Sequence, residues 1–185
     1  MEPVEIAAGA IQLQPWAPHD AREVFDACQD PAIQRWTTVP SPYTMADAQA
    51  FVGVITPAHW ADGTAASFAV KDATSGRVLA SVGLHELNSR DRSAELGFWA
   101  APWARGTGVV THASRVVCRW AFESGVTDHI RWIAGIGNEA SLRVAQKVGF
   151  TIDGSLRSRI RLGDGTRHDA LHGSLLPGEI TGETR

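Results

Sequence analysis

Hydrophobic and polar positions follow a helical spacing in most of the first third of the chain. An alternating run, Ala10–Trp16, predicts a first strand before these helices begin. Apolar residues three and four positions apart then predict a helix from Pro18 to about Gln29, which Pro31 ends. A short turn or helix carries Ile33 and Trp36, and Thr44 is a plausible N-cap for a further helix that Pro57 should end.

From Ser67 onwards the pattern changes to the period of two that is typical of strands. The strands expected after this point are 68–70, 78–84, 94–100, 130–136, 150–152, 157–162 and 168–175. Apolar positions 109, 110, 113, 116, 117, 120 and 121 predict an amphipathic helix that ends near Gly125. Asn138 can cap a second helix through Lys147. This order of elements predicts an α+β domain with a mixed sheet.

Length and composition favour one globular domain, expected over residues 8–177, with loose termini at 1–7 and 178–185. The formal charge of −3 and a pI near 6.1 argue against a general nucleic-acid binder. No apolar run approaches the roughly 20 residues that span a bilayer, so we expect a soluble, cytoplasmic protein without a membrane partner. Cys28 and Cys118 are expected to be reduced thiols, and the histidines show no metal-binding spacing, so no metal is expected.

A glycine-bearing loop, Ala100–Thr111, joins the strand at 94–100 to the helix that follows it. The start of a helix has free N–H groups and a partial positive charge, so an anion, above all a phosphate, is expected there. No lysine follows the glycines, which excludes a P-loop, and Thr111 stands where a dinucleotide fingerprint needs its third glycine. Two interpretations remain: a pyrophosphate-binding loop of the form R-x-x-G-x-G/A, or an ordinary strand-to-helix turn.

A second motif lies one strand downstream, at Asn138–Phe150, and reads N-x-x-S-x-x-V-x-x-K-x-G-F. With Glu95–Trp99, Arg105-x-x-Gly108 and Gly154–Arg157, it resembles the GNAT superfamily of N-acetyltransferases. Within that superfamily the chain looks like the branch of the ribosomal-protein N-terminal acetyltransferases. The resemblance covers about residues 67–176, and Val110 departs from the glycine or alanine of the loop motif.

The resemblance implies a mostly antiparallel sheet of six to seven strands, flanked by about four helices. Its central parallel pair, 94–100 and 130–136, should splay apart to admit the pantetheine arm of acetyl-CoA. The residues expected to bind acetyl-CoA are Phe98, Trp99 and Ala100 on the strand, Arg105, Gly106, Thr107, Gly108, Val109 and Val110 in the loop, and Asn138 and Ser141 on the following helix.

Catalytic candidates follow from the needs of acyl transfer, in which an amine loses a proton and a thiolate leaves. Ser141 is expected to donate a hydrogen bond to the thiolate, although it could instead only brace its helix. Glu95 is the first candidate for the base, His85 the second and His172 the third, each with a purely structural role as the alternative.

Two features of related enzymes are missing. The tyrosine that many relatives use as the acid is absent from the second helix, since the only tyrosine is Tyr43. Some relatives carry a glutamate shortly after the segment at Gly154–Arg157, where this chain has Ser158, Arg159 and Arg161. Arginines at 157, 159 and 161 alternate, which indicates a solvated strand face or, less favoured, attraction of an acidic substrate or a CoA phosphate.

The function expected is transfer of an acetyl or other acyl group from acetyl-CoA to a primary amine, directly within a ternary complex. The acceptor is a protein N-terminus or a small molecule. The alternative is a non-catalytic acyl-CoA-binding module. The sequence leaves open whether the protein forms a homodimer.

Overall fold

The computed structural model describes residues 1–163 and 165–182, whose strands form one eight-stranded sheet. The strand order is β1-β2-β3-β4-β5-β6-β8-β7, and every neighbouring pair is antiparallel except β5 and β6. The strands are β1 (Ile6–Ala8), β2 (Ile11–Pro15), β3 (Ala66–Asp72), β4 (Val78–Asn88), β5 (Ser93–Ala100), β6 (His129–Gly135), β7 (Thr151–Arg161) and β8 (Arg167–Leu175).

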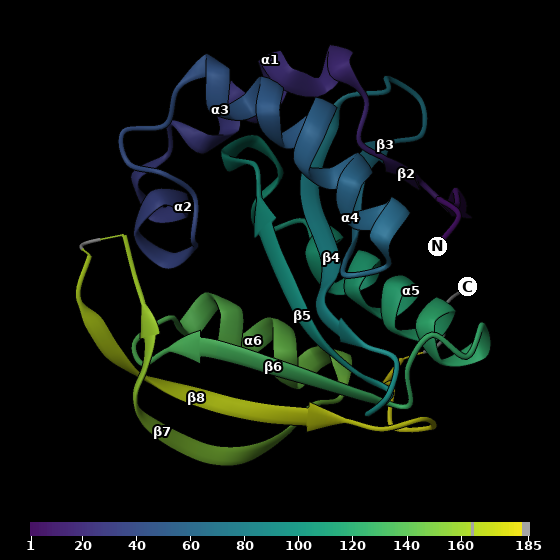
Figure 1. The fold of residues 1–185 in the computed structure, drawn as a ribbon, viewed down its shortest axis with the longest axis vertical. Helices are drawn as coiled ribbons and strands as arrows, with labels where there is room; N and C mark the ends of the chain where they lie inside the picture. The colour runs from purple at the N-terminus through teal and green to yellow at the C-terminus, as the bar shows by residue number, and fades with distance from the viewer. Residues whose placement is uncertain (164, 183–185) are drawn as a thin grey trace.

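The helices surround this sheet, with α1–α4 gathered at one end and α5 behind β4 and β5 (Figure 1). They are α1 (Ala21–Cys28), α2 (Pro31–Trp36), α3 (Met45–Ala50), α4 (Thr56–Asp62), α5 (Val109–Glu123) and α6 (Glu139–Val148), with a π-helical turn at Phe51–Ile55 and 3₁₀ turns at Pro18–Asp20 and Pro102–Ala104. Within the described residues, no helix combines the length and apolar character that a bilayer crossing requires.

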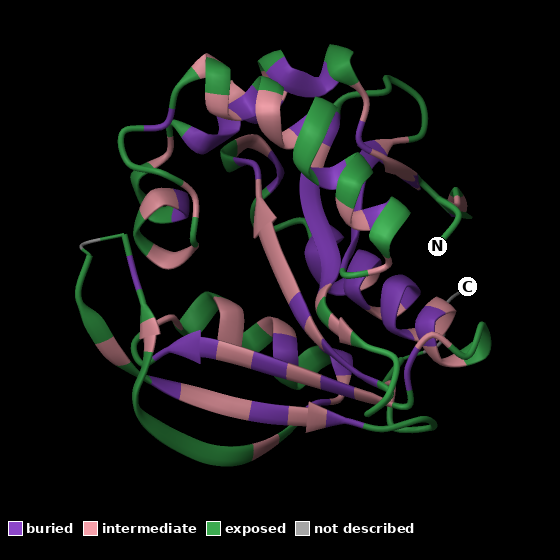
Figure 2. Ribbon diagram, in the orientation of Figure 1, coloured by how far each residue is buried: buried purple, intermediate pink, exposed green. Residues whose placement is uncertain are grey.

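Alternation along β3 divides the core between the two faces of the sheet. Phe68 and Val70 belong to the larger cluster, which includes the buried face of α5, whereas Ala69 between them packs with α1 and α3. Burial along α5 follows the predicted spacing, because Ala113, Val117 and Ala121 have no exposed surface (Figure 2). The sheet is therefore covered on both faces around β3 and β4, by elements that the hydrophobic pattern predicted, whereas β7 is mostly exposed.

The predicted fold class is confirmed, but the sheet has eight strands where six to seven were expected. The additional strand is β1, which lies partly within the terminus expected to be loose and pairs with β2. The amino group of Met1 also donates to the carbonyl of Trp60 at 2.8 Å, so this terminus is held against α4. At the other end Thr181 donates to Val148 at 2.9 Å, and residues 183–185 lie outside the described residues.

Two boundaries differ from prediction for physical reasons. The strands expected at 150–152 and 157–162 are one strand, β7, whose register against β8 shifts twice. Pro57 does not end the helix that begins at Met45, because it lies in the first turn of α4, where a missing N–H needs no acceptor. A π-helical turn links α3 to α4, and α4 continues past this proline to Asp62.

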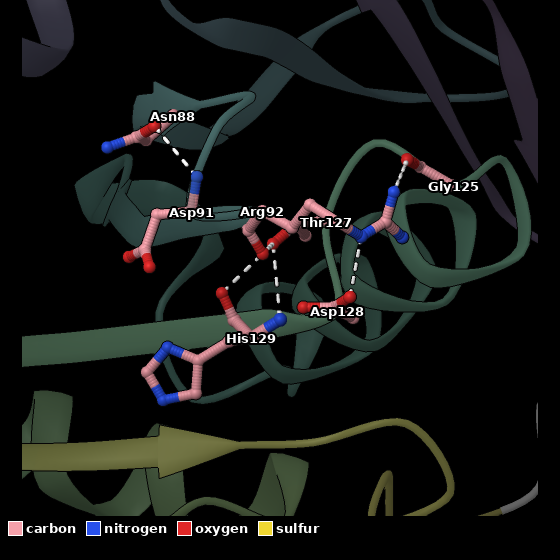
Figure 3. Close-up of polar contacts among 7 residues, drawn as sticks. All are labelled: Asn88, Asp91, Arg92, Gly125, Thr127, Asp128 and His129. Carbon is pink, nitrogen blue, oxygen red and sulfur yellow. Dashed lines mark hydrogen bonds and ion pairs between the residues drawn. The ribbon is translucent and has the colours of Figure 1, made fainter.

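Two turns hold the paired ends of β5 and β6 together (Figure 3). The Thr127 hydroxyl donates to the carbonyl of Arg92 at 2.5 Å, and the amides of Asp128 and His129 converge on the same oxygen. The Arg92 guanidinium donates in turn to the Asp128 carboxylate at 2.5 Å. We call Arg92, Thr127, Asp128 and His129 the strand clamp. It fixes β5 against β6 at one end and leaves the other end free to diverge.

Candidate active site

A splay between β5 and β6 provides the frame of the candidate site. The two strands pair only at Ser93↔His129, Ala94↔Ile130 and Glu95↔Arg131. Beyond these positions β5 pairs only with β4, and β6 only with β8. The backbone edges that face the splay are therefore open to an amide-rich ligand, as a strand edge is to an added strand.

The glycine loop lies where β5 ends and α5 begins. Gly106 and Gly108 have φ angles of 76° and 82°, which favour glycine, and Gly108 is the residue that caps α5. Within the described residues, the amides of Gly106, Thr107, Gly108 and Val110 donate to no acceptor. A Cβ atom at either glycine would meet nothing within 4 Å. The loop thus presents free donors and open space, which fits a pyrophosphate at a helix N-terminus.

The side chains around the loop leave this space clear. The Thr107 hydroxyl turns back to the carbonyl of Ala104 at 2.7 Å. Val110, which departs from the family motif, is 8% exposed and packs in the core, so its side chain does not crowd the loop. Val109 begins the helix and is buried in the same way.

Arg105 is committed to a partner that the sequence did not indicate. Its guanidinium donates to both carboxylate oxygens of Asp30, at 2.6 and 3.0 Å. Asp30 is also the N-cap of α2 and accepts from the amides of Ala32 and Ile33. The hydrogen bond from Arg105 is the main cause that lowers the pKa of the Asp30 carboxyl below its usual value. The Arg105 side chain therefore ties α2 to the glycine loop, and only its backbone remains for the phosphate role.

Asn138 and Ser141 meet at the start of α6, as predicted. The Asn138 side chain accepts from the Ser141 amide at 3.2 Å and so caps the helix. The Ser141 hydroxyl oxygen accepts from the indole N–H of Trp132 at 3.0 Å. No described residue accepts from the Ser141 hydroxyl, so its proton is available to a ligand. Sequence reasoning missed Trp132 as a site residue. Strand alternation could have indicated it, because Trp132 follows Arg131 on β6 and so faces the opposite side of the sheet.

Glu95 and His85 are direct cross-strand neighbours on β5 and β4. Arg131 stands opposite Glu95 on β6, so the three side chains share one face of the sheet. Burial raises the pKa of Glu95, the nearby Glu86 raises it further, and Arg131 and Arg159 partly oppose this. Burial lowers the pKa of His85 below its usual value, so its imidazole is neutral at pH 7.

Gly97 makes room for the His85 ring. A Cβ atom at position 97 would lie 2.8 Å from Cδ2 and 3.0 Å from Nε2 of His85. The imidazole therefore packs over Gly97, two residues along β5 from Glu95. The sequence alone did not indicate why position 97 is a glycine.

The remaining candidates are placed differently. Trp99 stacks on Trp16 with ring centroids 6.1 Å apart, and Phe98 packs against the core, so only the backbone of this segment faces the splay. His172 lies on β8 and pairs with Asp153 at 3.2 Å, separated from β5 by β6. Tyr43 is buried beside Cys28 in the cluster under α1 and α3, away from α6.

The described residues contain no group of three or more His, Cys, Asp or Glu side chains arranged to hold a metal ion.

The comparisons with known proteins identify the family of the chain and support its fold. The family model for the acetyltransferase (GNAT) domain matches residues 11–151, about three quarters of the chain. The chain belongs to this family. The resemblance inferred from the glycine loop and the Asn138–Phe150 motif is thereby confirmed.

Individual relatives extend the comparison. The chain is 34% identical over 108 residues to a Bacillus subtilis protein named "Putative ribosomal N-acetyltransferase YdaF", and the match covers 58% of each protein. It thus spans less than two thirds of that relative. Mycobacterium smegmatis RimJ in complex with CoA-disulfide has a TM-score of 0.83 at 19% identity, covering 100% of this chain and 94% of RimJ. The microcin C7 self-immunity acetyltransferase MccE, solved with acetyl-CoA and AMP, has a TM-score of 0.80 at 21% identity, with 91% and 93% covered. At these identities the two structures support the shared fold alone.

Proposed function

We propose that the protein is an acetyl-CoA-dependent N-acetyltransferase that transfers the acetyl group directly to a primary amine. The observation that carries the proposal is the splay between β5 and β6, which ends at a loop of unpaired amides. A chain whose only task was to pack a core would continue the pairing of two such apolar strands. The opening exposes strand-edge N–H and C=O groups that suit the amides of a pantetheine arm, and the free amides of the loop suit a pyrophosphate.

Binding of the coenzyme would use backbone donors. The amides from Arg105 to Val110 hold the pyrophosphate, with the partial positive charge of the α5 N-terminus behind them. The open edge of β5 at Phe98, Trp99 and Ala100 bonds to the pantetheine amides, and Asn138 contacts the same arm from α6. The bound acetyl-CoA supplies the thioester.

The two faces of the sheet at β6 offer separate positions for the amine and for the leaving group. The Arg131 side chain of β6 lies beside Glu95 of β5 on one face of the sheet. Trp132, the next residue of β6, faces the other side, where its indole N–H donates to the Ser141 hydroxyl. The amine therefore approaches from the Glu95 face, while the sulfur lies toward α6. This arrangement favours direct transfer in a ternary complex.

In the proposed reaction, a C–N bond forms as the thioester C–S bond breaks. Glu95, directly or through one water, takes the proton that the amine loses. A β5 amide near Phe98 or Trp99 polarises the thioester carbonyl, and the Ser141 hydroxyl donates to the departing thiolate. Glu95 is preferred to His85 as the base because its strand leads directly into the splay. A raised pKa also makes Glu95 a stronger proton acceptor than an ordinary carboxylate.

The test is a thiol-release assay over a broad panel of amines and peptides, with mass spectrometry of the products. Turnover with an acetylated product supports the enzyme. Tight acetyl-CoA binding without turnover of any amine would instead favour the non-catalytic binding module.

Ser141→Ala tests the mechanism within the same assay. Loss of the donor to the thiolate should lower kcat by roughly 10-fold or more while the dissociation constant for acetyl-CoA changes less than 3-fold. An unchanged kcat would remove Ser141 from the mechanism and leave it as a bracing residue of α6.

A further inference from the structure

Trp132 lies where the pairing of β5 with β6 ends. The last paired positions are Glu95 and Arg131, and Trp132 is the next residue of β6, so it stands at the closed end of the splay. The glycine loop lies at the opposite, open end, because it follows Ala100 at the end of β5. A coenzyme whose pyrophosphate is held by the loop would therefore extend its arm inward, with its sulfur toward Trp132.

The Trp132 side chain is fixed by the residues packed around it. It is 1% exposed and belongs to the larger core cluster, which includes buried residues of α5 and α6. Its partner across the β6–β8 pair is Gly173, and a Cβ atom there would lie 3.5 Å from Cε3 of the indole. An aromatic ring in a close-packed core has few alternative orientations. The direction of the indole N–H is therefore determined by the fold.

Ser141 is held both through its backbone and through its side chain. The Asn138 side chain accepts from the Ser141 amide at 3.2 Å and so fixes the backbone at the start of α6. The indole N–H of Trp132 donates to the Ser141 hydroxyl oxygen at 3.0 Å and occupies one of its two lone pairs. The hydroxyl proton cannot point toward the indole, because the two hydrogens would then face each other. In the part of the chain that the structure describes, no group accepts this proton.

We propose that Trp132 is a positioning residue that orients the Ser141 hydroxyl toward the sulfur of the coenzyme. As the thioester C–S bond breaks, its electron pair passes to sulfur, and the hydroxyl donates a hydrogen bond to the thiolate. Donation from Trp132 makes this hydroxyl a stronger donor, because hydrogen bonds in a chain polarise one another. The serine keeps its proton, the thiolate takes one from water as coenzyme A leaves, and Glu95 returns the proton of the amine to water. This inference rests on the proposed acetyltransferase activity and adds a residue to its mechanism.

Trp132→Phe removes the N–H and keeps an aromatic ring in the core. In single-turnover assays at saturating acetyl-CoA, with an amine that the panel identifies, the rate of acetyl transfer should fall by about 3- to 10-fold, as expected for the loss of one hydrogen bond. The dissociation constant for acetyl-CoA, measured by calorimetry, should change less than about 2-fold, because the lost interaction strengthens only as the thiolate forms.

A double-mutant cycle separates positioning from packing. In the Ser141→Ala background the hydroxyl is gone, so Trp132→Phe should slow acetyl transfer by less than about 2-fold. A ring that only supported the fold would slow both backgrounds by the same factor. Trp60→Phe is the matched control, since the Trp60 indole of α4 is 2% exposed and donates to the carbonyl of Ser67 at 3.3 Å. This control should leave the rate unchanged.

A second replacement preserves the packing that phenylalanine alters. Benzothienylalanine in place of Trp132 keeps the shape of the indole and exchanges its N–H for sulfur, so it should slow acetyl transfer as much as Trp132→Phe does.

The outcomes separate this inference from the proposed activity. A native rate with benzothienylalanine, or equal slowing by Trp132→Phe with and without the Ser141 hydroxyl, overturns the inference and leaves the acetyltransferase standing. A rate that Ser141→Ala does not lower also overturns it, because no hydroxyl then needs to be oriented. Absence of turnover with every peptide and amine overturns both proposals.

Discussion

At the scale of single residues, opposing influences converge on Glu95. Burial and the neighbouring Glu86 favour its protonated form, while Arg131 and Arg159 favour the carboxylate. The net result is a raised pKa, which suits a group that must accept a proton from an amine. The same burial lowers the stability of the folded protein whenever the Glu95 carboxyl is ionised.

Glu95→Gln tests both consequences. A raised pKa in the folded state means that the favourable contribution of Glu95 is present at low pH and is lost as pH rises through that pKa. The glutamine variant should therefore gain thermal stability relative to the native protein as pH rises from 4 to 8. Its kcat should fall by about 100-fold or more, and the acid limb of the native pH–rate profile should disappear.

Thermal melts and pH–rate profiles supply the measurements, with Glu123→Gln, which removes an exposed carboxylate of α5, as the control. An activity profile that keeps its acid limb in Glu95→Gln would exclude Glu95 as the base and favour His85. A stability difference that does not vary with pH would show that the Glu95 pKa is not raised.

The positions of individual site residues could be predicted from the sequence only where a local motif determined them. The glycine loop and Asn138 with Ser141 lie within short motifs, so their positions followed from local spacing. The contact between Arg105 and Asp30 joins residues 75 positions apart, and no local pattern indicates it. The packing of the His85 ring on Gly97 likewise depends on the register of β4 against β5, which turn length alone did not determine.

At the scale of elements, α2 is the connection between the two sides of the splay. Its N-cap, Asp30, is paired to the glycine loop, and the carbonyl of Arg35 near its other end accepts from the amide of Gly163 after β7. The sequence predicted only a short turn or helix here, because six residues carry too little periodicity to show which surfaces they contact. The position of α2 is determined by its contacts with residues that are distant in the sequence.

Gly163→Ala tests this placement. A Cβ atom at position 163 would lie 2.0 Å from the carbonyl oxygen of Gln34, so α2 must move away from the β7–β8 hairpin. We expect the free energy of unfolding to fall by about 1–3 kcal/mol, as overpacking typically costs. The KM for acetyl-CoA should rise as well, because Asp30 at the start of α2 is paired with Arg105 of the glycine loop.

Gly53→Ala is the matched control, since a Cβ atom there would meet nothing within 4 Å. Urea denaturation and steady-state kinetics of the two variants give the comparison. Equal stability of Gly163→Ala and Gly53→Ala would contradict the close contact between α2 and the hairpin.

At the scale of the whole molecule, the fold is a sheet whose parallel strands, β5 and β6, are paired at one end and diverge at the other. The sequence predicted the order of elements and, through the family resemblance, the splay itself. It did not predict β1 or the continuity of β7, because a three-residue strand and a bulged strand show little alternation. The strand clamp supplies the fixed end from which the splay diverges (Figure 3).

Thr127→Val should weaken that clamp. Thr127 is 1% exposed, and its hydroxyl bonds to the backbone of both Arg92 and His129. Its loss should lower the free energy of unfolding by about 1–2 kcal/mol in urea denaturation. Asp128→Asn alters an ion pair that is half exposed on both sides and should cost less than about 1 kcal/mol. A larger effect for Asp128→Asn than for Thr127→Val would reverse the importance assigned to the two contacts.

The central claim is that the free amides at the start of α5 hold the pyrophosphate of the coenzyme. Calorimetry with acetyl-CoA on Gly108→Trp tests it most directly, because the indole would fill the space above the loop. Gly76→Trp is the matched control, since Gly76 also has a positive φ, 72°, and open space around its Cβ position, but lies in the β3–β4 turn. Loss of acetyl-CoA binding by at least about 100-fold in Gly108→Trp, with native affinity in Gly76→Trp, is the predicted result; native affinity in both variants would contradict the account.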